Sequence, residues 1–548
     1  MKILPLALYS IKPLKPARMC MAITDMAMDV KGKVSIAMLC QLLHFSVQAA
    51  DSSFAPTISI EEVFSDNVEL SSFDKQNSLV TRAILGLNHS ISSAIINANI
   101  NGNYTHQFYS HDSDANEGYE SLSSQINITP WRKGPTVNLQ ANIANVPRST
   151  GGNFASDLIS GDTVRTTNYG AGLNYQVQNS DFLLSIGGQY NDSRSGDNVG
   201  ESYGYTNSFS FQNGIGQKNV FWDISSSYSD RKNRGESARS YQVQARFGVI
   251  TSWKLNPFIR YFDENFSGSV SNNSLNQGES YGAGFRWQPV NLMIIDLSYN
   301  AAEDEELSDD YVAFEFNWQP TTRTQISASY NQRFFGDSYG LNINHRNKRL
   351  TNTISYNEQI QAFQRDNFEV FTESVLFCPL NQPIDIDSCL SNLDNETQPE
   401  LFFELPIFDI RPVEDNQFSL NKRLAWNSTL SLSRTTFSLT ISSNEREDLN
   451  TGNTQDDVSF GLSTSRQLNA RSQLTAAYQF SRNDFFTRNV DIDTERRDYY
   501  RTYTIGYSRT LGKSISVNFD LRHLARTSNT NTRDYDENRA TLSITKDF

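Results

Sequence analysis

The sequence predicts an all-β fold, a transmembrane antiparallel up-and-down β-barrel of about 24 strands, in a range of about 22 to 26. Three features of the chain predict this class. Apolar and polar side chains alternate along successive segments, aromatic residues stand at both ends of the apolar series, and short and long connections alternate. Because a period of two sends neighbouring side chains to opposite faces of a strand, each strand should meet an apolar medium on one face and a polar medium on the other.

Two hairpins between residues 280 and 358 show the pattern most clearly. Trp287 and Trp318 each precede Gln-Pro, 31 residues apart, and proline belongs at a turn because it cannot donate to a sheet ladder. If the strands are antiparallel, both tryptophans fall at one level. The tyrosines at the other level are Tyr281, Tyr299, Tyr330 and Tyr339. Two aromatic belts around an aliphatic band are typical of strands that cross a membrane.

The composition agrees with one barrel domain over residues 51–548. Mean hydropathy is -0.51, and the body of the chain has no uncharged apolar run of 18 or more residues, which argues against membrane-spanning helices. Residues 51–548 hold 41 Lys and Arg against 59 Asp and Glu, a net charge of -18. This acidic balance argues against nucleic-acid binding, which needs a basic surface.

Residues 1–50 are predicted to be an N-terminal extension that ends in a secretory signal peptide. Lys31 and Lys33 precede a short apolar core at 34–47, and small residues follow it, so cleavage is expected near Ala49 or Ala50. The alternative is a short buried or membrane helix, but about 14 residues interrupted by Gln and His are too few to span a bilayer.

Strands are expected in order along the rest of the chain. The predicted ranges are 57–64, 78–88, 91–106, 118–129, 136–146, 164–177, 182–191, 202–212, 219–229, 239–250, 255–265, 279–288, 291–300, 311–319, 322–333, 338–346, 349–360, 415–432, 436–445, 456–466, 472–482, 498–509, 513–525 and 535–547. Tight turns alternate with longer connections, as in barrels with short periplasmic turns and long outer loops. Both termini are then expected in the periplasm.

Residues opposite the apolar series are predicted to line the lumen. They are Arg286, Glu315, Asn317, Arg323, Gln325, Arg333, Asn342, Asn344 and Arg346, with Gln242, Gln244, Arg246, Gln473, Gln479, Asn518, Asp520 and Arg522 elsewhere in the chain. Amide, hydroxyl and guanidinium groups form hydrogen bonds suited to sugars. Any barrel lumen must also be polar, so this pattern alone does not distinguish a sugar path from a general aqueous one.

The longest insertion, residues 361–414, carries many apolar residues and is expected to fold into the lumen or to cap the barrel. Cys378 and Cys389 have ten residues between them, and a disulfide is predicted because an exported chain meets an oxidising compartment. The insertion is then either a constriction or lid of the lumen held in place by the disulfide, or a loop that the disulfide merely stabilises and that has no part in transport.

The last strand ends with Leu542, Ile544 and the terminal Phe548 in alternation, a pattern similar to the C-terminal assembly signal of outer-membrane barrels. Phe548 is the expected assembly signal. Lys546 departs from that pattern, where another hydrophobic residue would be preferred.

Several motifs resemble the PEP-CTERM system-associated outer-membrane protein family. They are the two Trp-Gln-Pro hairpins, Phe334–Leu341 leading to His345 and Arg346, Thr353–Tyr356, Ile58–Asn67 and Ser78–Thr81. The resemblance implies a barrel in the outer membrane of a Gram-negative bacterium, associated with exopolysaccharide production and with exosortase sorting. It supplies no defined activity.

We therefore expect a porin-like conduit associated with exopolysaccharide export. A structural or surface-anchoring barrel without transport is the alternative, and an outer-membrane enzyme is the less favoured one. No catalytic, cofactor-binding or metal motif is found in the sequence. Expected partners are outer-membrane lipid, barrel-assembly machinery, and exopolysaccharide with its secretion machinery. Gated iron-type transporters are disfavoured because strands begin soon after the signal segment.

Overall fold

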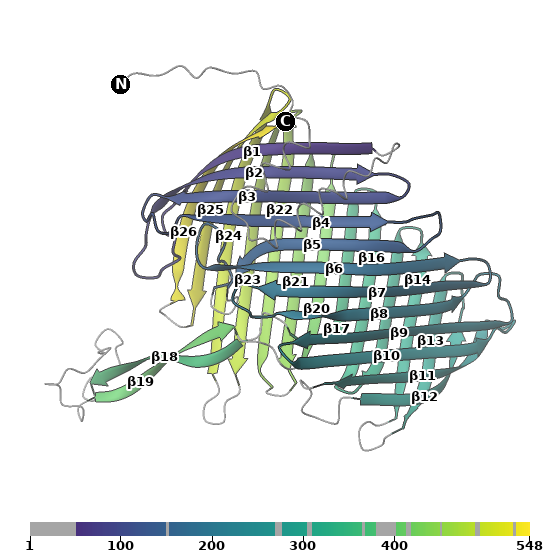
Figure 1. Cartoon of the computed structure of the whole chain (residues 1–548). Helices are drawn as coiled ribbons and strands as arrows, with labels where there is room; N and C mark the ends of the chain where they lie inside the picture. Colours follow the sequence, from purple (N-terminus) through teal and green to yellow (C-terminus); the bar gives the residue numbers. More distant parts are fainter. Residues whose placement is uncertain are drawn as a thin grey trace, which may run out of the picture.

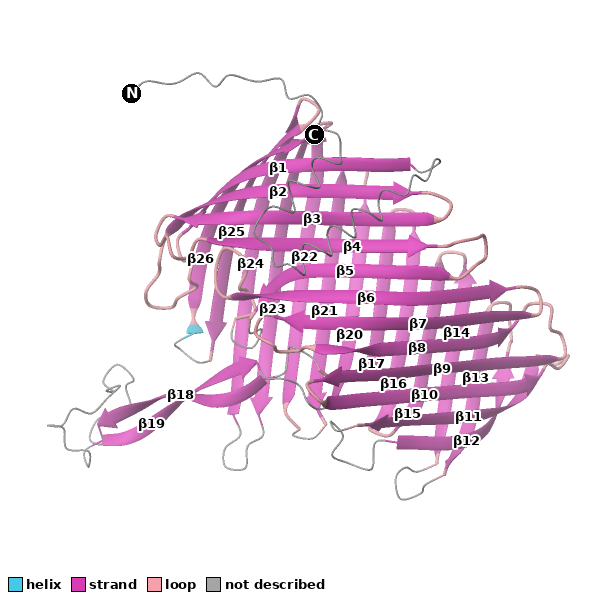
Figure 2. Ribbon diagram, viewed as in Figure 1, coloured by secondary structure: helices cyan, strands magenta, loops and turns pink. Residues whose placement is uncertain are grey.

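The computed structural model describes residues 51–548 except for 149–152, 269–276, 304–309, 364–367, 380–401, 413–417, 450–451, 488–493 and 530–532. The predicted cleavage positions, Ala49 and Ala50, lie outside the described residues. Strands dominate the described chain (Figure 2). None of its helical segments has the length and apolar character needed to cross a membrane.

The first twelve strands lead up to the first Trp-Gln-Pro turn. They are β1 (Asp51–Ser65), β2 (Ser78–Ser92), β3 (Ile96–Tyr109), β4 (Glu117–Ile128), β5 (Thr136–Pro147), β6 (Thr163–Gln178), β7 (Phe182–Ser195), β8 (Ser202–Asn213), β9 (Val220–Asn233), β10 (Glu236–Val249), β11 (Leu255–Ser267) and β12 (Gln277–Trp287).

Fourteen more strands follow. They are β13 (Met293–Ala302), β14 (Tyr311–Thr321), β15 (Thr324–Arg333), β16 (Gly336–Asn347), β17 (Leu350–Gln361), β18 (Phe368–Pro379), β19 (Phe402–Pro412), β20 (Ser419–Ser431), β21 (Thr435–Asp448), β22 (Thr454–Asn469), β23 (Ser472–Thr487), β24 (Thr494–Leu511), β25 (Ile515–Ser528) and β26 (Tyr535–Asp547).

Twenty-four of these strands form one closed antiparallel ring in chain order, which confirms the predicted fold class. The ring closes where β1 pairs with β26, with Thr57 opposite Asp547 and Ser65 opposite Arg539. Closure leaves no unpaired strand edge, as a barrel in a bilayer requires. In Figure 1 the strands of the near wall cross those of the far wall steeply, as strands tilted in one sense around a barrel do.

Strands β18 and β19 are not part of the ring. They pair only with each other, and β17 pairs directly with β20, so the chain leaves the wall and returns to it. Figure 1 shows this hairpin projecting away from the barrel. The prediction had no strands between residues 361 and 414 and placed the insertion in or over the lumen. The structure adds two strands that the prediction lacked, and this hairpin projects from the barrel, whereas the stem of the insertion lies inside one end of the barrel.

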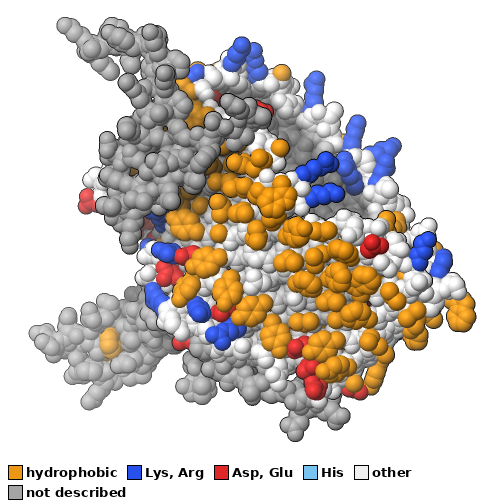
Figure 3. Space-filling model, turned by 45° about the vertical axis from the view of Figure 1, so that its right-hand side comes forward, with side chains coloured by type: hydrophobic (Ala, Val, Ile, Leu, Met, Phe, Trp, Pro, Cys, Tyr) orange, Lys and Arg blue, Asp and Glu red, His pale blue; other side chains and the backbone are white. Residues whose placement is uncertain are grey.

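The outer face of the barrel is apolar. Exposed aliphatic and aromatic side chains such as Ile60, Leu85, Ile259, Leu297 and Ile505 share this face across successive strands. In Figure 3 hydrophobic side chains form a broad orange band over the wall that faces the viewer. An apolar band of this extent on a folded surface is suited to lipid, because water would make it an aggregation site.

The two ends of the barrel differ in their connections. One end has short connections between strands, such as the two residues between β14 and β15, and we call it the turn end. The other end has most of the long connections, including 66–77 and 148–162, and we call it the loop end. Asp51 and Phe548 both lie at the turn end, where the Phe548 amide donates to the Pro56 carbonyl. One tight connection at the loop end, Arg234-Gly235, has φ values of 43° and 98°, the left-handed pair that a two-residue hairpin turn requires.

Candidate functional site in the lumen

The inner face of β3–β8 carries uncharged amide and hydroxyl side chains, and we call this surface the amide wall. Its members are Asn97, Asn99, Asn101 and Asn103 on β3, Ser121, Ser123, Gln125 and Asn127 on β4, Asn138, Gln140 and Asn142 on β5, Asn168 and Asn174 on β6, Gln189 and Asn191 on β7, and Thr206, Ser208 and Ser210 on β8. Glu117, at the loop end, is the one charged residue on the inner face of these fully described strands.

Many side chains of the amide wall are accessible inside the barrel. Asn99, Gln125 and Gln140 are exposed although they point away from the outer face. Some members bond to one another across strands. Asn191 Oδ1 accepts from Gln140 Nε2 at 3.3 Å and from Gln189 Nε2 at 2.9 Å. An amide has two donors and an acceptor with two lone pairs, so these contacts leave hydrogen-bonding capacity facing the lumen.

The inner face of β9–β14 is different, because charged side chains pack tightly there. We call the group Asp223, Arg246, Arg286, Asp296 and Glu315 the charged corner. Arg246 donates to all three carboxylates, to Asp223 at 2.6 Å, to Asp296 at 2.8 Å and to Glu315 at 2.6 Å. Arg286 donates to both oxygens of Asp296, at 2.8 and 2.7 Å. Arg246 therefore joins strands β9, β10, β13 and β14 from the inside.

Two further arginines extend this packing toward the loop end. Arg260 donates to Asn300 at 3.1 Å and to Asn331 at 3.0 Å. Arg333 donates to Glu264 at 2.8 Å, and the Glu264 side chain is fully buried. Aromatic rings pack beside these cations, with the Arg286 guanidinium 4.1 Å from the centroid of the Phe221 ring. This side of the lumen is filled with side chains.

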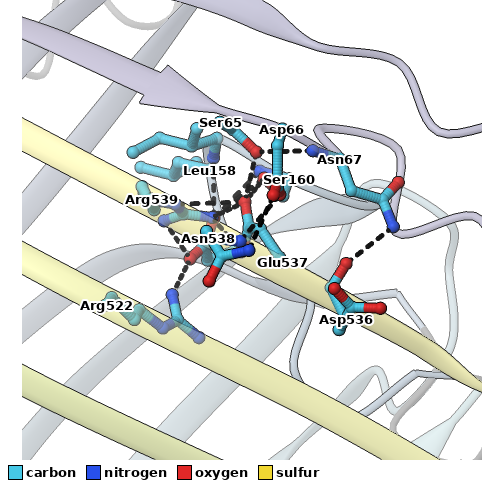
Figure 4. Close-up of polar contacts among 12 residues, drawn as sticks. Ser65, Asp66, Asn67, Leu158, Ser160, Arg522, Asp536, Glu537, Asn538 and Arg539 are labelled. Carbon is cyan, nitrogen blue, oxygen red and sulfur yellow. Dashed lines mark hydrogen bonds and ion pairs between the residues drawn. The ribbon is translucent and has the colours of Figure 1, made fainter.

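A loop folds into the barrel at the loop end, and we call its described residues 153–162 the latch. They belong to the connection between β5 and β6, yet they contact inner-face residues of β24–β26 and β1–β3. Asp157 accepts from Arg522 and from Arg539, each at 2.8 Å. Figure 4 shows Ser160 of the latch beside Glu537 and Arg539 of β26. The Tyr109 hydroxyl lies 3.3 Å from the Leu158 carbonyl oxygen. The latch therefore crosses the inside of the seam where the ring closes.

Buried polar groups hold the latch in place. Ser160 donates to Glu537 at 2.7 Å and accepts from Arg539 at 2.8 Å. Ser65 also donates to Glu537, at 2.6 Å, and the Glu537 side chain has no exposed surface. Burial disfavours ionisation of Asp157, but the charges of Arg539 and Arg522 outweigh it and lower the pKa of Asp157 to about 2. Asp157 is thus ionised throughout the physiological pH range.

The base of the long insertion is also anchored inside the loop end. Ala362 and Phe363, just after β17, and Phe418, just before β20, are buried against Phe266 and Ala238 of β11 and β10. Cys378 on β18 is buried and disulfide-bonded. Its predicted partner, Cys389, lies outside the described residues. The insertion is therefore fixed at its stem, while its hairpin projects from the barrel.

The structure places the predicted lumen residues on the inner face or at its turn-end rim. Arg286 and Glu315 belong to the charged corner, and Arg333 pairs with Glu264. The other predicted residues of this group are less buried, and most of them lie near the turn end. They are Asn317, Arg323, Gln325, Asn342, Asn344 and Arg346. The predicted lumen residues did not include the amide wall, although the alternation of Asn97, Asn99, Asn101 and Asn103 was a signal for it.

The predicted aromatic belt residues lie on the outer face. Trp287, Tyr299 and Tyr339 are exposed there, and Trp318 and Tyr330 are half-buried. Phe548 is exposed at the turn end. Within the described residues, no group of three or more His, Cys, Asp or Glu is arranged to hold a metal ion.

Comparisons with known proteins match the barrel alone. No family model matches the chain, and no curated protein matches it. The siderophore receptor PirA of Acinetobacter baumannii is 9% identical over 90% of this chain and 80% of that one, with a TM-score of 0.42. OpdK of Pseudomonas aeruginosa, solved with vanillate, is 9% identical over 90% and 99%, with a TM-score of 0.35. A loop-deletion mutant of OmpT, an outer-membrane protein of Vibrio cholerae, is 8% identical over 91% and 100%, with a TM-score of 0.31.

The chain has the fold of an outer-membrane β-barrel. Its closed ring, apolar outer face and polar inner face are the features that define this class. Identities this low leave the function to be inferred from the lumen itself.

Proposed function

We propose that this protein is a non-catalytic outer-membrane conduit for hydroxyl-rich solutes, with its turn end and both termini in the periplasm. The family resemblance makes exopolysaccharide the favoured cargo, and small hydrophilic solutes are the broader alternative. The observation that carries the proposal is the amide wall, an uncharged surface of accessible amides and hydroxyls that runs across β3–β8.

The chemistry of the amide wall suits a moving sugar chain. Amides and hydroxyls both donate and accept, as sugar hydroxyls do, so each step along the wall exchanges one hydrogen bond for a similar one. A neutral hydrogen bond contributes only about 0.5–1.5 kcal/mol net, so no single site would trap the chain. Charged groups would bind a polar cargo more tightly, and on the adjoining strands β9–β14 they are already paired with one another in the charged corner.

The latch supplies a restriction at the loop end in this proposal. Its ion pairs with Arg522 and Arg539 hold the loop inside the barrel rather than above it. A conduit for a flexible polymer needs such a restriction, because an open barrel of about 24 strands would leak small solutes.

A conductance experiment tests the proposal. The purified protein and a variant lacking residues 153–160 would be inserted into planar bilayers, with neutral oligosaccharides added as blockers. We expect a small conductance in the intact protein, a severalfold rise in the variant, and oligosaccharide block in both. A matched control shortens 196–201, another loop-end connection.

If neither the intact protein nor the variant conducts, the proposed conduit is contradicted and the alternative, a surface-anchoring barrel, is favoured. One feature supports that alternative: the latch, the insertion stem and the charged corner all occupy space inside the ring. Secretion of polymer by a strain that lacks the gene would separate the two cargo classes. Unchanged secretion with reduced uptake of small solutes would contradict exopolysaccharide as the cargo.

A further inference from the structure

The short connections at the turn end are strongly basic. The eleven turns that join consecutive barrel strands there hold ten Lys and Arg and a single acidic residue, Asp181. We call the ten cations the basic turn rim. They are Arg132, Lys133, Lys218, Lys254, Arg323, Lys348, Arg349, Arg434, Arg471 and Lys513.

The connections at the loop end have the opposite charge. They hold seven Lys and Arg against thirty Asp and Glu, counted from the sequence with the insertion included. The barrel is therefore polarised along its axis. In Figure 3 blue side chains gather along the upper right edge of the apolar band.

Acidic groups of the described chain do not neutralise the basic turn rim, although Lys254 Nζ donates to the Pro289 carbonyl oxygen at 3.3 Å. All ten are exposed, and none of them forms an ion pair with a described residue. At the loop end, by contrast, Arg148 pairs with Asp162 at 2.5 Å although its side chain is 45% exposed. Ten cations without acidic partners on one rim repel one another, so a neutralising anion is expected outside the chain.

Large apolar side chains stand beside these cations in the same turns. Trp131 precedes Arg132 and is 61% exposed, and Trp253 precedes Lys254 and is 86% exposed. Ile215, in the turn that contains Lys218, is 96% exposed. A tryptophan or aliphatic side chain next to a cation is the pattern that settles at a membrane interface, with the ring among the headgroups and the charge toward phosphate.

We infer that the basic turn rim binds the anionic headgroups of phospholipids in the leaflet at the turn end. The inference rests on the membrane placement proposed above and adds a lipid class to it. Charge complementarity supplies the attraction, and continuity with the apolar outer band brings the headgroups into reach of the cations. A soluble polyanion would satisfy the charges but would leave Trp131, Trp253 and Ile215 in water. The lipid interface accounts for both sets of side chains.

Lipid selectivity in reconstituted membranes tests the inference. The full-length protein would be placed in phosphatidylcholine bilayers that contain a trace of spin-labelled phosphatidylglycerol or spin-labelled phosphatidylcholine. The immobilised fraction of each label would be measured by electron paramagnetic resonance. We expect phosphatidylglycerol to be preferred severalfold in 0.1 M salt. The preference should fall toward one in 1 M salt, because screening shortens from about 10 Å to about 3 Å.

A variant with all ten cations changed to Gln should lose the preference, and one with Arg and Lys exchanged at the ten positions should keep it. A matched control replaces Lys75, Arg148 and Arg234 at the loop end with Gln and should also keep it. Insertion of each variant into neutral bilayers, checked by heat-modifiable gel mobility, separates a failure of folding from a failure of the inference. Equal preference in the Gln variant, or a wild-type protein that binds polyphosphate in detergent but shows no lipid preference, would overturn it.

Discussion

The amide wall and the charged corner are opposite solutions to the same requirement for a polar lumen. Both lie on the inner faces of strands with identical alternation, and both are closed off from lipid by apolar residues on the other face. Gln125 and Gln140 of the wall are exposed, whereas Arg246 is 8% and Asp296 4% exposed. The uncharged side chains of the wall therefore remain accessible to the lumen, while the charged side chains of the corner form ion pairs with one another and are buried.

The difference follows from the strength of the contacts. Two opposite charges at less than 3 Å attract strongly when water is excluded, so Arg246 draws strands β9, β10, β13 and β14 toward one another. Amides that bond at 2.9–3.3 Å contribute less and compete with water on equal terms. The corner thus stabilises the barrel wall, and the amide wall leaves a surface that a solute can use.

Removing the central cation of the charged corner should have the largest effect on stability. Arg246→Met removes a buried guanidinium and leaves the half-buried Asp223 and Glu315 without their arginine, and the loss of one partner of a buried ion pair costs about 3–5 kcal/mol. The free energy of unfolding in urea, measured in detergent micelles, would show it. Arg346→Met is the matched control, since Arg346 is exposed on the inner face and forms no ion pair with a described residue.

The control should change the free energy of unfolding by about 0.5 kcal/mol or less, as surface substitutions usually do. Equal losses in the two variants would mean that the corner is no more important than any other part of the inner face. The contrast between the two walls would then have no energetic basis.

The sequence was sufficient to predict the barrel and its strands. All 24 predicted strands overlap barrel strands, because a period of two is a local property that survives in every strand. The inner-face parity of residues such as Glu315 and Asn342 followed for the same reason. The charged corner was predicted only in part. The alternation placed its residues on the inner face, but their mutual contact depends on the curvature of the wall between β9 and β14.

The latch and the hairpin could not be predicted from local patterns. Asp157 meets Arg539 across 382 positions of sequence, and no periodicity reports such a contact. Strands β18 and β19 lie in a stretch whose apolar residues do not alternate regularly, so the stretch was interpreted as a loop. Both features depend on tertiary contacts or on pairing that a single-strand pattern does not contain.

The latch offers a second test, with a smaller expected effect, of the contrast between charged groups that pair with one another and amides that stay accessible to the lumen. Arg539→Met removes the cation between Asp157 and Glu537 and leaves Glu537, which is fully buried, with hydroxyl partners only. We expect latch opening to become about 3 kcal/mol easier, seen as faster hydrogen exchange of residues 153–162. Arg423→Met, at an exposed inner-face position of β20, should leave that exchange unchanged. Protection that persists in Arg539→Met would show that the latch is held by its other contacts.

Changes in the amide wall should affect passage rather than stability. Gln125→Leu with Gln140→Leu removes two accessible amides from neighbouring positions on β4 and β5. Each lost hydrogen bond is worth about 1 kcal/mol, so oligosaccharide block should weaken about five- to thirtyfold while salt conductance changes little. Planar-bilayer recordings provide both numbers. The matched pair Ser225→Ala with Ser227→Ala on β9 removes smaller groups and should weaken block less; an equal effect would show that wall amides have no special role.

Acidity should have the smallest effect on the latch over most of the accessible range. The pKa of Asp157 is about 2 in the folded protein, below its ordinary value near 4, because Arg539 and Arg522 outweigh the effect of burial. A lowered pKa means that the contribution of this carboxylate is fully present above about pH 4 and is lost as the pH falls through about 2. A spin label on Ala155→Cys should therefore stay immobile from pH 8 to pH 4 and gain mobility only below that. With Asp157→Asn, the same label should be equally mobile at every pH, and a wild-type transition between pH 5 and pH 7 would contradict the assignment of the latch to this ion pair.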